Sequence, residues 1–426
     1  MAGCSRKRLP NCRPRCAKCA SRLPKPPRPR SKLSLYPNFK FDILKPCTKS
    51  RARLGRLTTP HGAIETPNFI FCGTHAGLRS MTGEEAKAAG AQIVLANTYH
   101  MLVRPGPDVV AKLGGLHKMM VWDGPIMTDS GGFQIFIMGY EGNSDEIKMR
   151  GKKAPKKSLI KINEEGAWFY SYLNGEKIHL TPERSMDVQK ALGADLIYQL
   201  DECTSSAHGK NYHADSMRMS LRWGDRCIKR FAETNDGKQA LYGIVQGGNF
   251  EDLRRESAAR VNEQDFFGMA VGGYFGKSKD NLVDIVALTM EAIRRDRPVH
   301  MLGIGHVEDI FAGVRQGIDT FDCVEPTRLA GHGTMLLKGQ PRMRINLRNS
   351  KYRGDDTPLD ATSTFHISRQ YTRGTLHHLV QAQEPLAEHV LSMHNVSVMM
   401  QLFGEIREAI RTDTLDQCEK EWLCTN

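Results

Sequence analysis

The chain of 426 residues lacks any apolar run near the roughly 18 residues that a membrane-spanning helix needs, so the sequence excludes a helical membrane protein. It also lacks the cysteine spacing of a disulfide framework. Its 11 cysteines are scattered, and those beyond the N-terminal segment mostly lie within apolar runs, which indicates free thiols in a reducing compartment. Hydrophobic residues make up 40% and charged residues 25%, as in an ordinary globular protein, and we expect a cytoplasmic location.

Acidic residues are absent from the first 34 positions, which hold 11 Lys and Arg residues. These 11 cations account for all but +2 of the formal net charge of +13, so the rest of the chain gives no electrostatic argument for a nucleic-acid partner. Segment 1–37 is rich in Pro and Cys and lacks the apolar core of a secretory signal, so its composition predicts a disordered extension. A basic RNA-binding arm, a transit peptide and an extension without function remain open. Cys12, Cys16 and Cys19 have ligand-like spacing, but no second ligand pair follows nearby, which disfavours a zinc site there.

Eight short apolar runs follow, each leading into polar residues or glycine, and segments of helical character separate them. The runs cover residues 67–72, 93–95, 125–127, 196–200, 240–245, 266–271, 299–304 and 320–321. The best helical segments cover 83–89, 182–192, 216–234, 249–261, 281–294 and, last, 394–410. Alternation of strand and helix predicts a parallel sheet. Eight units predict an α/β fold of the (β/α)8 TIM-barrel type, with a doubly wound open sheet as the alternative.

These patterns divide the chain into four parts: a basic extension over 1–37, a catalytic barrel over 38–340, a small subdomain over 341–393, and a C-terminal helix with its tail over 394–426. Insertions interrupt the repeat at 138–178, which contains the basic run 148–153, and at 340–400. A charge run of this kind is usually a solvated loop, although one beside an active face can contact phosphates.

Three carboxylates stand directly at strand ends, namely Asp129, Asp201 and Asp322. Two such groups can act as the nucleophile and the acid/base of a retaining glycosyl transfer. The third, with an amide such as Gln246 and the backbone of glycines, can bind the polar edge of a flat heterocycle, while Phe133 covers its face. Two alternatives remain. One is a tight turn in which Asp129 caps a helix; the other is a metal site formed by the three acids, which the absence of a nearby His pair disfavours.

The strand ends carry long motifs that together span most of residues 50–410. They read GAQIVLANTYHMLVRPG (90–106), GPIMTDSGGFQIF (124–136), LDECTSSA (200–207), ALYGIVQGG (240–248), AVGG (270–273), LGIGHVEDI (302–310) and GIDTFDCVEPTR (317–328). In these segments the chain resembles the tRNA-guanine transglycosylase (queuine tRNA-ribosyltransferase) family, whose members exchange a guanine in tRNA for a 7-deazaguanine. TDSGGFQ together with FDCVEPTR is the most specific part of the resemblance.

The resemblance implies a transferase that replaces guanine at the anticodon wobble position of tRNA with queuine or a related 7-deazaguanine, without ATP. Asp322 would be the nucleophile on ribose C1′, forming a covalent Asp–ribose intermediate, and Asp129 would be the general acid/base. The base pocket would consist of Asp129, Ser130, Gly131, Gly132, Phe133, Asp201, Gln246 and Gly273. The RNA contacts would come from Gly303, Ile304, Gly305, His306, Val307, Glu308, Asp309, Thr327 and Arg328. The partners would be tRNA and the free base, with a homodimer left open.

Two other functions on the same barrel remain as alternatives. One is a nucleoside hydrolase, and the other is a non-catalytic RNA-binding subunit that pairs with an active partner. The presence of both Asp322 and Asp129 favours a catalytic chain over the second alternative.

Two features depart from the family pattern. Relatives hold a structural zinc with a C-x-C-x-x-C motif and a His, but the cysteine positions fall here on Ser363, Phe365 and Ser368, and only His394 remains. Because Phe cannot ligate zinc and Ser is a poor substitute for a thiolate, we expect a degenerate zinc-type subdomain and no metal cofactor. Relatives also usually carry a glutamate where Lys277 stands. A cation there disfavours the aminomethyl precursor, so queuine is the favoured base.

Overall fold

Eight parallel strands close into a barrel in the computed structural model, which describes residues 35–140, 159–205, 208–273 and 279–424. Around the barrel the strands follow the order β10-β11-β12-β13-β14-β4-β5-β6, so strands that follow one another along the chain are neighbours in space. Their bounds are β4 Asn68–Cys72, β5 Val94–Ala96, β6 Ile126–Thr128, β10 Leu196–Tyr198, β11 Ala240–Val245, β12 Gly268–Val271, β13 Val299–Met301 and β14 Thr320–Cys323. Each predicted apolar run overlaps one of these strands, which confirms the (β/α)8 barrel.

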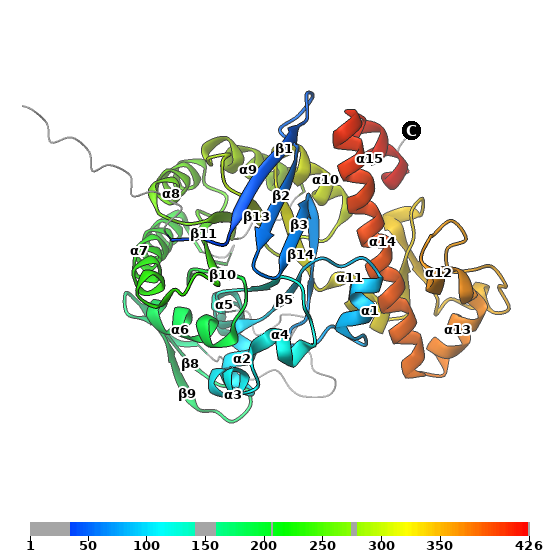
Figure 1. Cartoon of the computed structure of the whole chain (residues 1–426), viewed down its shortest axis with the longest axis horizontal. Helices are drawn as coiled ribbons and strands as arrows, with labels where there is room; N and C mark the ends of the chain where they lie inside the picture. Colours follow the sequence, from blue (N-terminus) through cyan, green and yellow to red (C-terminus); the bar gives the residue numbers. More distant parts are fainter. Residues whose placement is uncertain (1–34, 141–158, 206–207, 274–278, 425–426) are drawn as a thin grey trace, which may run out of the picture.

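Helices follow the strands and surround the barrel (Figure 1). Their bounds are α1 Gly83–Ala88, α2 Thr98–Val103, α3 Pro107–Lys112, α4 Gly115–Met120, α5 Gly132–Tyr140, α6 Pro182–Leu192, α7 Lys210–Thr234, α8 Glu251–Glu263, α9 Lys279–Ala292, α10 Val307–Gln316 and α11 Glu325–Gly331. In helix α6 the local sequence sets both ends of the helix. Thr181 caps its first turn, Pro182 occupies the first helical position, and Gly193 ends it in the left-handed conformation. Across the described ranges, no helix combines the length and hydropathy that a bilayer span requires.

A three-stranded antiparallel sheet, β1 Lys40–Pro46, β2 Arg53–Thr59 and β3 Gly62–Thr66, covers the N-terminal end of the barrel and crosses it in blue in Figure 1. The sequence did not predict this sheet. Arg53 joins it to the barrel, because its Nη2 lies 2.6 Å from Oδ2 of Asp319, and the two side chains are only 2% and 0% exposed. The same oxygen of Asp319 accepts a hydrogen bond from the Val299 amide at the start of β13, at 2.7 Å. A buried, fully bonded ion pair therefore closes the end of the barrel that lies opposite the strand carboxyl ends.

The insertion predicted over 138–178 contains a second antiparallel sheet, formed by β7 Leu159–Asn163, β8 Gly166–Tyr170 and β9 Lys177–Leu180, which contacts α5. Four predictions fall on residues outside the described ranges: the disorder of the N-terminal extension over 1–34, the absence of a zinc site at Cys12, Cys16 and Cys19, the basic run 148–153, and the role of Lys277.

A smaller apolar core lies in the segment after the eighth barrel strand, seen at the right of Figure 1 in yellow and orange. Its elements are β15 Thr334–Leu336, the 3-10 helix η2 Pro341–Met343, β16 Arg344–Asn346, the 3-10 helix η3 Ser350–Tyr352, α12 His366–Gln370 and α13 Arg373–Gln381. Buried Met335, Leu359, Leu376 and Leu391 are among the side chains that form this core. Strand β15 pairs with β16 across the predicted boundary at residue 340, and the four-part division of the chain remains a prediction.

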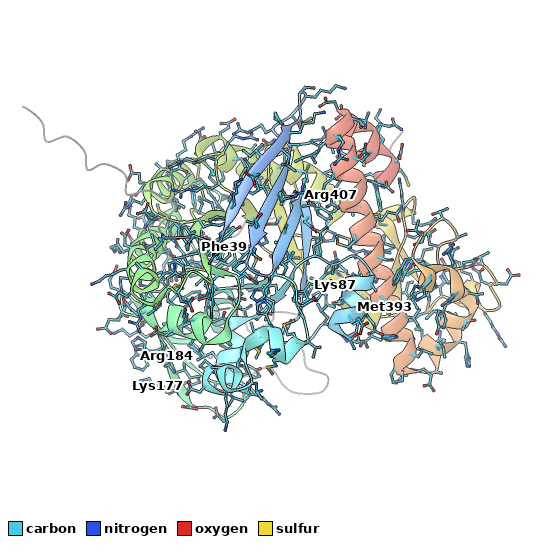
Figure 2. The ribbon with its side chains drawn as sticks, viewed as in Figure 1. Phe39, Lys87, Lys177, Arg184, Met393 and Arg407 are labelled. Carbon is cyan, nitrogen blue, oxygen red and sulfur yellow. The ribbon has the colours of Figure 1, made fainter. Side chains whose placement is uncertain are left out.

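The last long helix begins earlier than expected. The sequence placed its start at His394, but α14 spans Pro385–Thr412, and a further helix, α15 Leu415–Leu423, follows. Pro385 at the first helical position suits this start. The helix is continuous because its first half buries Leu391 in the smaller core while its second half buries Phe403 in the barrel core. Figure 2 shows Arg407 on α14 beside the blue sheet, where its Nη1 donates to the carbonyl oxygen of Pro67 at 2.8 Å.

Candidate active site

The three predicted carboxylates lie at the carboxyl ends of their strands, where parallel strands of a barrel present their side chains together. Asp129 follows β6, Asp201 follows β10, and Asp322 lies within β14. The charge of Asp322 contributes to raising the pKa of Asp129, and the charge of Asp129 in turn contributes to raising the pKa of Asp201. Asp129 therefore lies within electrostatic reach of both Asp322 and Asp201, at one rim of the barrel.

Asp129 is held by a complete set of donors. Its Oδ1 accepts from the Thr98 amide at 2.7 Å, and its Oδ2 accepts from Asn97 Nδ2 at 2.6 Å and from Gln134 Nε2 at 2.9 Å. Burial nevertheless raises the pKa of Asp129, since its cost outweighs these three bonds, and the neighbouring charge of Asp322 adds to the effect. A carboxyl with a fixed orientation and a raised pKa is suited to hold and release a proton. Of its partners, sequence reasoning missed Asn97 and Gln134.

Asp322 is held mainly through one of its two oxygens. Oδ1 lies 3.0 Å from Nε2 of His300 and accepts from the Gly303 amide at 2.9 Å. His300 is fully buried, and its other nitrogen, Nδ1, lies 2.9 Å from the Thr320 hydroxyl. Oδ2 lies 3.6 Å from the sulfur of Cys72. The carboxylate thus has a fixed orientation, with one oxygen committed to two strong donors.

His300 was not predicted as a site residue. The only sign in the sequence is a polar side chain at the second position of the apolar run 299–304. A buried histidine in such a run is usually a satisfied core residue, so its contact with Asp322 could not be inferred without the barrel register.

A second polar cluster surrounds Asp201. Gln246 Nε2 donates to its Oδ2 at 2.6 Å, and Ser130 Oγ donates to its Oδ1 at 3.1 Å. Burial raises the pKa of Asp201 to about 6, with smaller contributions from the charges of Asp129 and Glu202. This cluster brings together three of the residues predicted for a base pocket.

Two glycines of the predicted pocket allow this close packing. A Cβ on Gly132 would overlap the carbonyl oxygen of Asp201, and a Cβ on Gly273 would overlap Oε1 of Gln246. Gly273 also has φ +90°, a conformation that other residues rarely adopt. Gly131 is buried beside the backbone of Tyr99. Phe133, at the start of α5, is 43% exposed, so its ring is available to cover a ligand.

Arg254 of α8 orders the loops that carry these glycines. Its Nε donates to the carbonyl oxygen of Gly248 at 2.7 Å, and its Nη1 donates to those of Val245 and Gly272 at 3.0 and 2.8 Å. Burial lowers the pKa of Arg254 to about 10, so the group remains charged at neutral pH. A buried cation that binds three carbonyl oxygens fixes the ends of β11 and β12. No pattern in the sequence indicated this role.

Most residues predicted to contact RNA form the loop after β13 and the start of α10, while Thr327 and Arg328 lie in α11. Gly303, His306 and Glu308 are exposed, and Arg328 is half-buried. The remaining half-buried positions are Ile304, Gly305 and Val307. Asp309 and Thr327 are 8% and 5% exposed, so these two side chains face the protein interior.

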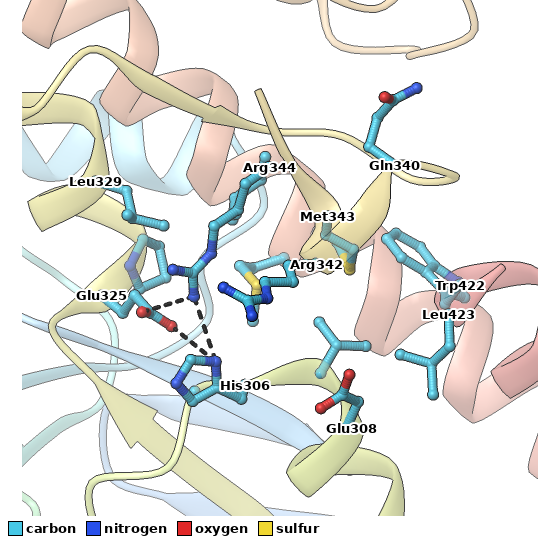
Figure 3. A pocket seen from close by; sticks show the side chains of 15 residues that line it. His306, Glu308, Glu325, Leu329, Gln340, Arg342, Met343, Arg344, Trp422 and Leu423 are labelled. Atoms are coloured by element: carbon cyan, nitrogen blue, oxygen red, sulfur yellow. Dashed lines mark hydrogen bonds and ion pairs between the residues drawn. The ribbon is translucent and has the colours of Figure 1, made fainter. Parts of the chain in front are cut away.

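A cavity of about 240 Å³ opens beside this loop (Figure 3). It is lined by Gly305, His306, Val307, Glu308, Glu325, Pro326, Leu329, Leu336, Gln340, Arg342, Met343, Arg344, Met399, Trp422 and Leu423. Arg344 Nη2 donates to Glu325 Oε1 at 2.7 Å and lies 3.3 Å from His306 Nδ1. The cavity therefore has a polar, partly cationic side next to the loop and an apolar side formed by residues such as Trp422.

The fold and this rim define a class: a (β/α)8 barrel with three carboxylates at the carboxyl ends of its strands. Comparison with known proteins identifies the family. The model of the family described as Queuine tRNA-ribosyltransferase matches residues 47–426. The chain is 42% identical over 394 residues to the queuine tRNA-ribosyltransferase of Roseiflexus sp. (strain RS-1). This alignment covers 90% of this chain and 98% of that protein. It is 41% identical over 386 residues to the queuine tRNA-ribosyltransferase of Thermoanaerobacter sp. (strain X514), in an alignment that covers 90% of this chain and 97% of that protein. The chain belongs to the queuine tRNA-ribosyltransferase family, which confirms the resemblance inferred from its motifs.

Family membership overturns the expectation that the chain has no zinc. The matched residues include all of 341–393, the family binds a structural zinc, and nothing in the structure is positive evidence that the site was lost. That prediction was wrong because it equated the missing thiolates with a missing metal.

The side chains at these positions show what is available to a metal. Ser368 Oγ lies 2.8 Å from Nδ1 of His394, whose Nε2 lies 2.7 Å from the Leu336 carbonyl oxygen. Burial lowers the pKa of His394 to about 4, so the ring is neutral, as a metal ligand must be. Ser363 is also buried within this subdomain. A zinc held by this histidine would link α14 to the smaller core, and none of the chemistry below passes through a metal.

Proposed function

We propose that this chain exchanges guanine at the wobble position of tRNA for queuine or a related 7-deazaguanine. The observation that carries the proposal is the pair Asp322 and Asp129 at one rim, beside the polar cluster around Asp201, in a chain that belongs to this family. Such a pair meets the requirement of a retaining exchange, in which one carboxylate attacks the sugar and a second group handles protons.

In the first half of the reaction, the Asp322 carboxylate attacks ribose C1′, and the bond from C1′ to N9 of guanine breaks. The electron pair of that bond leaves with the base, which takes a proton from Asp129. The raised pKa of Asp129 supports this role, because a group that gives up a proton must first hold one. His300 and the Gly303 amide hold Oδ1 of Asp322, which orients the carboxylate for attack.

In the second half, the incoming base loses its N9 proton to the Asp129 carboxylate and attacks C1′ through N9. The ester bond between Asp322 and C1′ breaks, and both carboxyl groups return to their starting states. The covalent intermediate preserves the free energy of the glycosidic bond, so the exchange needs no ATP.

The cluster around Asp201 would select the base. The ionised carboxylate accepts hydrogen bonds, as the N–H groups on the polar edge of guanine require. Oε1 of Gln246 is buried and has no hydrogen-bond partner in the described part of the chain, so it is a second acceptor for the base. Gly273 lets the base approach the backbone, and exposed Phe133 would cover the ring. Outside this pocket, the exposed side chain of His306 and the half-buried Arg328 are the best placed of the predicted RNA contacts.

We propose queuine as the physiological base, on the sequence alone. Lys277, which lies outside the described residues, replaces a glutamate that helps relatives to recognise the aminomethyl group of the bacterial precursor. Incorporation of both bases into one tRNA substrate tests this. A clear preference for the aminomethyl precursor would contradict it.

We further propose a cytoplasmic location, the four-part division of the chain, and self-association as a homodimer. Light scattering of the purified full chain tests the last of these. A monomer at all concentrations used in activity assays would contradict it.

The decisive experiment measures radiolabelled guanine exchange into tRNA by the purified full chain. We expect exchange by the wild-type chain, none by Asp322→Asn, and normal exchange by Asp296→Asn, which changes an exposed carboxylate on the surface. Release of free base without exchange would indicate a nucleoside hydrolase instead. Binding of tRNA without turnover would indicate a non-catalytic subunit.

A further inference from the structure

A cluster of two histidines and a buried carboxylate lies at the opposite end of the barrel from the candidate active site. Asp195 directly precedes β10, His117 belongs to α4, and His61 lies in the turn between β2 and β3. His61 Nδ1 lies 2.7 Å from Asp195 Oδ1, and His117 Nε2 lies 3.1 Å from Oδ2. Three elements far apart in the sequence thus place their polar atoms at one point.

The geometry of the cluster is that of a set of ligand atoms. The nitrogen and oxygen atoms of the three side chains all lie within 4.8 Å of one another. The two imidazole rings are stacked, with centroids 3.7 Å apart and an angle of 23° between their planes. Oδ2 of Asp195 also accepts from the Ile126 amide at 2.8 Å, which fixes the orientation of the carboxylate. In metal sites a bond of this kind to a ligating side chain is a common supporting feature.

Charge is the second observation. Asp195 is 0% exposed, and within the described ranges its ion-pair partners are the two histidines, with no Lys or Arg. The buried carboxylate of Asp319, at the same end of the barrel, is instead neutralised by Arg53. An ionised carboxylate without a cation is costly inside a protein. A proton on one of the histidines, or a cation bound between them and Asp195, supplies the positive charge that offsets this buried carboxylate.

We propose that His61, His117 and Asp195 form a binding site for a divalent transition metal, with Zn²⁺ as the ion that fits best. Two imidazoles and a carboxylate are ligands that zinc accepts, at about 2.0–2.2 Å, which places tetrahedral ligand atoms about 3.3 Å apart. To reach this spacing, the present separations of 2.7 and 3.1 Å need to open by about 0.6 and 0.2 Å. His61 is 39% exposed in its turn, so it has room to move, and water reaches the fourth position from that side.

The role of this metal is structural. It joins the turn of the β2–β3 hairpin to α4 and to the start of β10, and so fastens the N-terminal sheet to the barrel. The site lies at the N-terminal strand ends, away from Asp129 and Asp322, so it is independent of the proposed exchange reaction.

Cobalt titration of the untagged full chain tests the proposal. The protein is stripped with EDTA and titrated with Co²⁺, with visible absorption as the readout, for the wild type, His61→Gln, His117→Gln and the control His378→Gln, an exposed histidine on α13. Each of the first two variants is expected to bind one Co²⁺ fewer than the wild type, or to bind it at least about 10-fold more weakly. The control should match the wild type. A metal site in the smaller subdomain is shared by all four stripped proteins, so any Co²⁺ that it binds cancels in the comparison.

Two further measurements complete the test. Zn²⁺ should raise the melting temperature of the wild type more than that of His61→Gln, while guanine exchange stays the same in both. Equal Co²⁺ stoichiometry and affinity in the wild type and in both histidine variants would overturn the proposal. So would equal losses in the control, because these would place the effect elsewhere.

Discussion

Replacement of Asp201 by Asn tests the electrostatics of the proposed base pocket most directly. Burial raises the pKa of Asp201 from 3.8 to about 6, although hydrogen bonds from Gln246 and Ser130 favour its charged form. The folded protein therefore binds this proton more tightly than the unfolded chain does. The contribution of Asp201 to stability is fully present at low pH and is lost as the pH rises from the unfolded pKa through the folded pKa.

The magnitude follows from the two pKa values. At about 1.4 kcal/mol for each pKa unit, the difference between 3.8 and about 6 costs about 3 kcal/mol once Asp201 is ionised in both states. About 1.4 kcal/mol of this cost falls between pH 5 and pH 8. Asn stays neutral throughout. Its oxygen can accept from Gln246 while its amide donates to Ser130, so the local hydrogen bonds survive.

We therefore expect Asp201→Asn to gain stability relative to the wild type as the pH rises, by about 1.4 kcal/mol from pH 5 to pH 8. Guanine exchange should fall at the same time, because an amide presents a donor where the base needs an acceptor. Urea unfolding curves of the full chain at the two pH values measure the first effect, with Asp296→Asn as an exposed control. A stability difference that is constant, or that shrinks from pH 5 to pH 8, would refute the burial argument.

Two further predictions concern His300 and the N-terminal end of the barrel. His300→Gln should slow formation of the covalent intermediate by about 10-fold or more, because a hydrogen bond to a charged group contributes about 1.5–3 kcal/mol. The KM for tRNA should change little. A raised KM with an unchanged single-turnover rate would contradict the role of His300 in positioning Asp322. Asp319→Asn should lower the free energy of unfolding by about 3–5 kcal/mol, because it leaves the buried Arg53 without its partner. In the same urea experiment, the exposed control Asp296→Asn should change stability by less than about 0.5 kcal/mol, and a similar small change in Asp319→Asn would show that the buried pair is dispensable.

The barrel could be predicted because buried parallel strands are apolar on both faces. Runs such as ALYGIV at 240–245 are therefore visible without any knowledge of their neighbours. The N-terminal sheet was missed for the opposite reason. The strand KFDILKP is mostly exposed, and the ion pair that anchors the sheet joins Arg53 to a residue 266 positions away. The predicted start of a helix was wrong where the helix packs against two cores, as α14 does.

The residues of the candidate site likewise divide into those that the sequence predicts and those that only the structure shows. Asp129, Asp201 and Asp322 could be found because each stands at the end of an apolar run, and their motifs identify the family. His300 and Arg254 could not, because their roles depend on hydrogen bonds to other strands and loops. The zinc prediction failed for a related reason: it judged the metal from residue types at four positions and took no account of the family match across the whole subdomain.

By itself, the sequence determined the barrel, the family and the three acids, because strand periodicity and contiguous motifs are local properties of the chain. Only the tertiary structure decided which oxygen of Asp322 is held by His300, how far burial raises the pKa of Asp201, and that His61, His117 and Asp195 meet at one point. These features depend on distance and burial among residues far apart in the chain, and folding alone brings those residues together.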